Sequence, residues 1–139
     1  MNSRGLFIIL ALVTPASFAG NETPSDFLLG KYLLVGKGVD TGQVYTGKVE
    51  IFRDKSELRV KRIIGNKVVV GSAAIESALG GDANVLRFRY NEGGKKYEQT
   101  CLWLSDLDNY ARISCYLYKS GEHTIDPGLE ALFHDHTSE

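Results

Sequence analysis

The sequence has few of the residues that mark an enzyme or a nucleic-acid-binding protein. Basic and acidic side chains are nearly equal in number, 16 against 17, whereas nucleic-acid binders are usually strongly basic. No Gly-x-Ser-x-Gly nucleophile motif occurs, and the glycine-rich stretch 36–42 lacks the Gly-Lys-Ser/Thr ending of a phosphate loop. We therefore expect no catalytic residues, no cofactor and no bound nucleic acid.

Long apolar runs are also scarce, and the longest lies at the N-terminus. Leu6–Val13 is apolar, Arg4 precedes it, and the small residues Ala16-Ser-Phe-Ala19 follow. Spanning a bilayer takes about 20 apolar residues, so this run is too short, and Pro15 ends it. A positive charge, a short apolar core and a small-residue cleavage site are the three parts of a secretory signal. The sequence thus predicts a signal peptide over residues 1–19, a secreted or periplasmic protein, and no transmembrane anchor after cleavage.

Cysteine is limited to two residues, Cys101 and Cys115. In an oxidising compartment, an even pair in a small domain favours a disulfide over a metal site. A redox-active pair is the alternative, but no Cys-x-x-Cys motif supports it.

The remaining sequence is typical of one all-β domain. Residues 20–27 are polar and form a short tether, residues 28–133 form the domain, and residues 134–139 form a C-terminal tail. Within the domain, short alternating segments are separated by turn residues. About eight such strands favour an antiparallel up-and-down β-barrel, with a β-sandwich as the alternative. The segment Ala73–Asp82 is ambiguous, because it is also compatible with one helical turn.

The position of one turn predicts the disulfide register. If Asp106–Tyr110 forms a hairpin tip, Cys101 lies directly opposite Cys115, and Trp103 lies opposite Ile113. Directly opposed residues of antiparallel strands are close enough for a disulfide. A loop of this size would stabilise the domain by about 3 kcal/mol in the chain-entropy model.

The same alternation assigns residues to the interior of the barrel. An eight-stranded barrel is either filled by side chains or open to one small ligand. Arg62 continues the inward phase of Leu58 and Val60, and would pair there with a carboxylate of the ligand. The candidate ligand-binding residues are Tyr45, Leu58, Val60, Arg62, Phe88, Tyr90, Tyr97 and Trp103.

The opposite face of the disulfide hairpin is unusually apolar for a sheet surface in water. Either the C-terminal segment covers it, or it is a patch for a protein partner. The candidate partner-binding residues are Leu102, Leu104, Arg112, Tyr116 and Tyr118. The basic stretch Arg53–Lys67, with a net charge of +4, is a second candidate surface, although such a run is also typical of a solvated face.

One segment resembles a known group of barrels. Phe27-Leu-Leu-Gly30-Lys-Tyr32-Leu-Leu-Val35 is similar to the opening Gly-x-aromatic strand of the calycins, which include lipocalins, fatty-acid-binding proteins and avidins. Gly30-x-Tyr32, Gly36 and Tyr45-x-Gly47-x-Val49-x-Ile51 also resemble small exported bacterial β-barrel proteins. The resemblance implies an up-and-down barrel with Tyr32 closing one end. Tyr32 stands where the family usually has Trp, and the Arg and Tyr fingerprints of fatty-acid binders are absent, so no ligand residue is carried over.

The histidines suggest one further site. His134-Asp-His136 has metal-binding residue types, but a stable site needs further fixed ligands, and a solvated tail explains the same residues. We therefore expect no metal. Together, the observations favour an exported, non-enzymatic β-barrel that binds a small apolar ligand. The alternative is a protein-binding module, such as an inhibitor of a secreted enzyme, an immunity factor or an adhesin.

Overall fold

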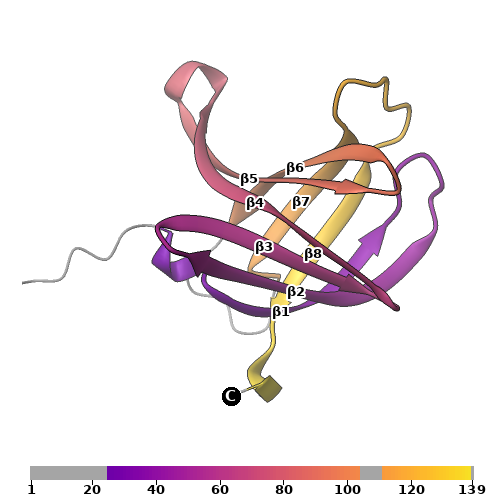
Figure 1. Ribbon diagram of the computed structural model, residues 1–139. Coiled ribbons are helices and arrows are strands. Elements are labelled where there is room, and N and C mark those ends of the chain that lie inside the picture. Colours follow the sequence, from indigo (N-terminus) through magenta and orange to yellow (C-terminus); the bar gives the residue numbers. More distant parts are fainter. Residues whose placement is uncertain (1–24, 104–110, 139) are drawn as a thin grey trace, which may run out of the picture.

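The computed structural model describes residues 25–103 and 111–138, which form eight strands and three short 3₁₀ helices (Figure 1). The strands are β1 (Gly30–Lys37), β2 (Val44–Asp54), β3 (Glu57–Ile64), β4 (Lys67–Ala78), β5 (Ala83–Glu92), β6 (Lys95–Trp103), β7 (Ile113–Lys119) and β8 (Gly128–His134). The helices are η1 (Asp26–Leu28), η2 (Leu79–Gly81) and η3 (His136–Ser138). The predicted signal peptide, Leu104 and the hairpin tip Asp106–Tyr110 lie outside the described residues.

The strands form a closed barrel in chain order, each antiparallel to its neighbours. β8 pairs with β1 and completes the ring, with Leu34 opposite Leu132. The predicted up-and-down barrel is therefore confirmed, and the β-sandwich alternative is wrong. The alternation of side chains explains this result, because in β1 Tyr32 and Leu34 are buried while Leu33 and Val35 are exposed.

The disulfide and its register are also confirmed. β6 and β7 pair so that Cys101 lies opposite Cys115 and Trp103 opposite Ile113. The two cysteines are bonded to each other, and their Cα atoms are 4.0 Å apart. Both side chains are buried on the inward face of the sheet.

Part of one hairpin leaves the barrel wall, and we call it the arm: Ala74–Ala78 of β4, η2, and Ala83–Val85 of β5. The ladder between β3 and β4 ends at Arg59 and Ser72, yet β4 continues in pairing with β5 as far as Ala78. Figure 1 shows the arm projecting at the upper left. The helical turn considered for Ala73–Asp82 is therefore limited to η2, because the residues before it pair with β5 as a strand.

The C-terminal segment does not cover the face of Leu102 and Tyr116. It forms β8, whose hydrogen bonds to β1 and β7 make it part of the wall. The side chains of Leu102 and Tyr116 are consequently 65% and 60% exposed. His134, assigned to the tail by sequence, is the last residue of β8.

Large side chains fill the barrel interior. An eight-stranded barrel encloses a space just wide enough for this. The Tyr32 hydroxyl donates to the carbonyl oxygen of Leu28, the last residue of η1, at 2.9 Å. Burial raises the pKa of Tyr32 to about 12. The largest fully buried residues are Tyr32, Phe88, Leu28, Leu34, Ile51, Leu86, Ile113, Leu132, Gln99, Val49, Val60 and Cys101.

Asp40 ties the β1–β2 loop to the β7–β8 loop. Its carboxylate accepts hydrogen bonds from the backbone N–H groups of Ile125 and Asp126, at 3.0 and 2.9 Å. The Lys119 ammonium donates to its other oxygen at 2.8 Å. The bond from Asp126 and the bond from Lys119 favour the ionised carboxylate and lower the pKa of Asp40 to about 2.

This lowered pKa predicts an acid-sensitive loop contact. Because the pKa of Asp40 is lower than its ordinary value of 3.8, the unfolded protein binds more protons at acid pH. The stability that Asp40 contributes is therefore complete above about pH 4 and is lost as the pH falls towards about 2. We expect the difference in unfolding free energy between the wild type and Asp40→Asn to shrink over this range, as measured by urea unfolding. An NMR titration of the Asp40 carboxyl carbon with a midpoint near 3.8 would contradict the assignment.

Candidate functional site

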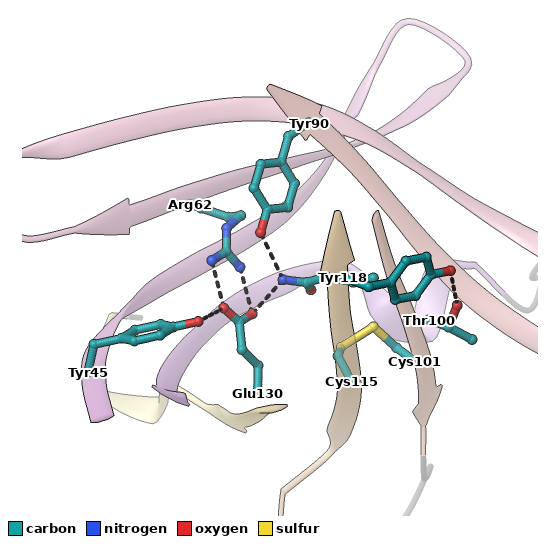
Figure 2. The surroundings of a disulfide bond; sticks show 9 residues. Tyr45, Arg62, Tyr90, Thr100, Cys101, Cys115, Tyr118 and Glu130 are labelled. Atoms are coloured by element: carbon teal, nitrogen blue, oxygen red, sulfur yellow. Dashed lines mark hydrogen bonds and ion pairs between the residues drawn. A yellow bond between two sulfur atoms is a disulfide. The ribbon is translucent and has the colours of Figure 1, made fainter. Parts of the chain in front are cut away.

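A buried ion pair joins two distant parts of the barrel wall. Arg62 of β3 and Glu130 of β8 both point into the interior, and each side chain is at most 3% exposed. Two guanidinium nitrogens of Arg62 donate to the two carboxylate oxygens of Glu130, each at 2.6 Å. Figure 2 shows this bidentate pair beside the disulfide. A planar, two-bond contact of this kind is the strongest form of ion pair that proteins make.

Three more side chains complete the cluster, which we call the internal network. The Tyr45 hydroxyl donates to one oxygen of Glu130, and the Gln99 amide donates to the other at 2.7 Å. The same amide group lies 3.2 Å from the Tyr90 hydroxyl. The Arg62 guanidinium lies 4.6 Å from the centre of the Tyr90 ring, within the range of a cation–π contact.

A glycine makes room for the network. Gly36 of β1 pairs with Tyr45 on one side and with Glu130 on the other. A Cβ atom at Gly36 would lie 2.6 Å from the Tyr45 ring, so any other residue would push the ring away from Glu130. The Gly36 and Tyr45 positions singled out by the resemblance thus serve the internal network.

The electrostatics of the network keep Arg62 charged and the phenols of Tyr45 and Tyr90 neutral. Burial works against the charge on Arg62, but its hydrogen bonds to Glu130 and the negative charge of that carboxylate together outweigh burial and raise its pKa. Burial raises the pKa of Tyr45, and the neighbouring Glu130 charge raises it further. Burial likewise raises the pKa of Tyr90. Neither phenol is therefore poised to ionise near neutral pH, and the network is suited to holding strands together.

The structure brings the eight candidate ligand residues to the inward face, but most are already engaged. Leu58, Val60 and Phe88 belong to the packed core. Tyr90 stacks on Tyr97, with ring centres 5.7 Å apart. Ligand binding by these residues remains a prediction.

Glu130 was not predicted from the sequence. Its carboxylate binds Arg62 in the place where the carboxylate of a ligand was expected. The signal was present, because Gly128-Leu-Glu130-Ala-Leu132 alternates as a strand does. It was obscured by the acidic composition of the residues after Lys119. An arginine in the inward phase requires a carboxylate in the inward phase of another strand, and Glu130 meets that requirement.

On the outside of the barrel, an apolar hollow of about 940 Å³ runs from the arm across the outward side of β6, β7, β8 and β1. We call it the outer groove. Its walls carry aliphatic and aromatic side chains, with Lys37 and Arg87 among the few charged residues that border it. Its apolar residues include Val35, Val44, Ala78, Leu79, Val85, Leu102, Tyr116, Leu129 and Ala131.

Two of the predicted partner-binding residues, Leu102 and Tyr116, line the outer groove. Tyr118 is engaged within the molecule, because its hydroxyl contacts Glu98 and also lies 2.9 Å from the Thr100 hydroxyl. Arg112 is half-buried and directly precedes β7. The sequence therefore located the middle of the groove but not its borders, which come from the arm and from β1.

The basic side chains of the stretch Arg53–Lys67 do not all face the same side, because successive residues of a strand point to opposite faces of the sheet. Arg62 points inward to Glu130, whereas Arg53 binds the Asp26 carboxylate at 2.6 Å. Lys67 lies 4.0 Å from Glu92. The net charge of +4 read from the sequence is thus not displayed on one outer surface.

The C-terminal histidines are close together without forming a metal centre. The rings of His134 and His136 are 4.8 Å apart, but the Asp135 carboxylate accepts hydrogen bonds from Thr137. Within residues 25–103 and 111–138, no three His, Cys, Asp or Glu side chains are grouped to hold a metal ion. None of the helices in these same ranges is long and apolar enough to cross a membrane.

Comparison of the chain with protein-family models and with curated proteins yields no match.

Proposed function

We propose that this chain is an exported, non-enzymatic binding protein that holds a protein partner in the outer groove. The observation that carries the proposal is the groove itself, about 940 Å³ in volume and lined by exposed apolar side chains. Contiguous apolar surface on a soluble domain is costly in water and usually marks an interaction site. An inhibitor of a secreted enzyme, an immunity factor and an adhesin all belong to this class.

The position of the groove favours a protein over a small apolar ligand. Sites for small molecules usually bury most of the ligand surface. The outer groove extends from the arm across four strands, so one small apolar molecule would cover only part of its apolar lining. A protein partner inserts apolar side chains and covers them with its own polar rim. The barrel interior supports a small ligand less well, because Phe88, Leu86 and the Arg62–Glu130 pair fill it.

Hydrogen bonding favours a helical segment of the partner. The central strands of the groove floor, β6, β7 and β8, are each paired on both sides. An extended segment lying on this floor would find no free strand edge for its own N–H and C=O groups, which are costly to bury unpaired. An amphipathic helix satisfies its own backbone and presents an apolar stripe.

The proposed location is the periplasm or the extracellular space. The support is the signal-like sequence of residues 1–19 together with the Cys101–Cys115 disulfide, since disulfides persist in oxidising compartments.

A photo-crosslinking experiment in the cells that make the protein tests the proposal. The photoreactive residue p-benzoylphenylalanine replaces Leu102, Tyr116 or, as a control, Val68 in the full chain. Val68 is an exposed valine of β4 that does not line the groove. We expect a discrete adduct with a second, different protein from positions 102 and 116, and none from position 68. Adding Leu129→Asp should abolish the adduct, because it places a charge in the apolar floor.

Other adducts would contradict the proposal in recognisable ways. An adduct with lipid or with a second copy of the chain would assign the groove a different occupant. Equal adducts from all three positions, or none from any, would show that the outer groove is not a specific site.

A further inference from the structure

The departure of the arm from the barrel opens a second hollow, on the inward side of the wall. The ladder between β5 and β6 ends at Leu86 and Cys101, although β6 continues to Trp103 and β5 starts at Ala83. With the β3–β4 ladder also ending early, the arm separates from both neighbouring strands. The hollow between them has a volume of about 380 Å³, and we call it the mouth pocket.

The mouth pocket combines an apolar floor with uncommitted polar groups. Leu58, Ile75 and Trp103 line it on the inward side, and Ser56 and Asn84 stand at its border. Within the described part of the chain, neither the Ser56 hydroxyl nor the Asn84 amide hydrogen-bonds to another protein group, and both residues are exposed. A mainly apolar concave site with a few converging polar groups is the usual form of a small-molecule site, and 380 Å³ lies within the customary range of about 300–1,000 Å³.

We propose that the mouth pocket binds a compact, uncharged and largely apolar molecule that bears one hydrogen-bonding group. Its apolar body contacts Leu58, Ile75 and Trp103, and its polar group bonds to the Asn84 amide. An uncharged ligand fits because the arginine of the pocket, Arg53, is paired with Asp26 at 2.6 Å. A charged group on the ligand would therefore lose its hydration in the pocket without gaining an opposite charge that is free to pair with it.

This site is independent of the proposed protein partner. The outer groove lies on the outward side of the arm and the mouth pocket on the inward side, and their lining residues do not overlap. It also differs from a ligand enclosed in the barrel, since that space is occupied by Phe88 and Val60. The alternation of side chains explains why the two sites are separate. Ile75 and Asn84 lie on the inward face of β4 and β5, in the arm, where these strands no longer pair with the barrel wall.

The test uses N-phenyl-1-naphthylamine, a neutral aromatic probe with one N–H group. Trp103 is the single tryptophan of the chain, so quenching of tryptophan emission reports on this residue alone. We expect saturable quenching with one probe bound per chain. Asn84→Phe, which places a ring in the pocket, should weaken binding about tenfold or more, and Leu102→Asp in the outer groove should leave it unchanged.

A second blocking variant separates occlusion from misfolding. Ser56→Phe lies in the exposed β2–β3 turn, and it should also weaken probe binding while the circular dichroism spectrum stays that of the wild type. Absence of saturable quenching would overturn the proposal. So would quenching that Leu102→Asp abolishes while Asn84→Phe and Ser56→Phe leave it intact, since the probe would then occupy the outer groove.

Discussion

Replacing Glu130 with alanine should lower the free energy of unfolding by about 3–5 kcal/mol, as is typical when one partner of a buried ion pair is removed. The Arg62 guanidinium would stay buried without its carboxylate, and the Tyr45 hydroxyl would lose its acceptor. Glu130→Gln should be nearly as damaging, because the amide is uncharged and one of its two groups is a donor. Urea unfolding followed by circular dichroism measures both variants.

Two controls separate the buried charge from a general effect of truncation. The double variant Arg62→Met with Glu130→Leu removes both charges and keeps apolar volume, so it should recover the part of the loss that comes from the unpaired Arg62 charge, whereas Tyr45 and Gln99 still lose their acceptor. Glu76→Ala removes ion pairs with Arg87 and Arg89 on the outer surface, where each such pair contributes less than about 1 kcal/mol. If Glu130→Ala cost no more than Glu76→Ala, the internal network would not be a structural centre of the barrel.

Most of the fold could be predicted because it depends on patterns among residues that are close together in the sequence. Strict alternation sets which face of each strand is buried, and it correctly placed Leu58, Val60 and Arg62 on one side. The disulfide register followed from a turn position and the equal spacing of Cys101 and Cys115 about it, which pairing in the structure confirms. Both features require only a few neighbouring residues.

The internal network and the arm depend on information that is not local. Arg62 and Glu130 are 68 residues apart in the sequence, and they meet only because β8 returns to β1 and closes the ring. A single short alternating segment in an acidic region gives weak evidence of a strand. The arm is equally hidden, because the pattern of β4 does not reveal where its neighbour β3 stops pairing with it.

The inside and the outside of the barrel are physically linked through β8. Glu130 points inward to Arg62, while the residues on either side of it, Leu129 and Ala131, line the outer groove. Fixing Glu130 by hydrogen bonds therefore also fixes the floor of the groove. The outer groove would lose its shape in Glu130→Ala even though none of its apolar side chains has changed.

The disulfide should contribute a second large share of the stability. Cys101 and Cys115 are separated by 14 positions, and closing a loop of this length is worth about 3 kcal/mol in the chain-entropy model. The informative variant is Cys101→Ala with Cys115→Ala, since it removes the bond without leaving a free thiol or a buried hydroxyl. We expect its free energy of unfolding, measured in urea, to be lower by about 2–5 kcal/mol.

Reductant provides the matched control for this prediction. Wild-type protein whose disulfide has been reduced should unfold at a lower urea concentration, whereas the double alanine variant should be insensitive to reductant. Outward-facing Leu102 and Tyr116 directly follow the two cysteines and line the outer groove, so loss of the bond should also weaken photo-crosslinking from these positions before the barrel unfolds. A double variant as stable as the wild type would mean that strand pairing alone holds β6 and β7 together, and that the disulfide is not what keeps this part of the groove in place.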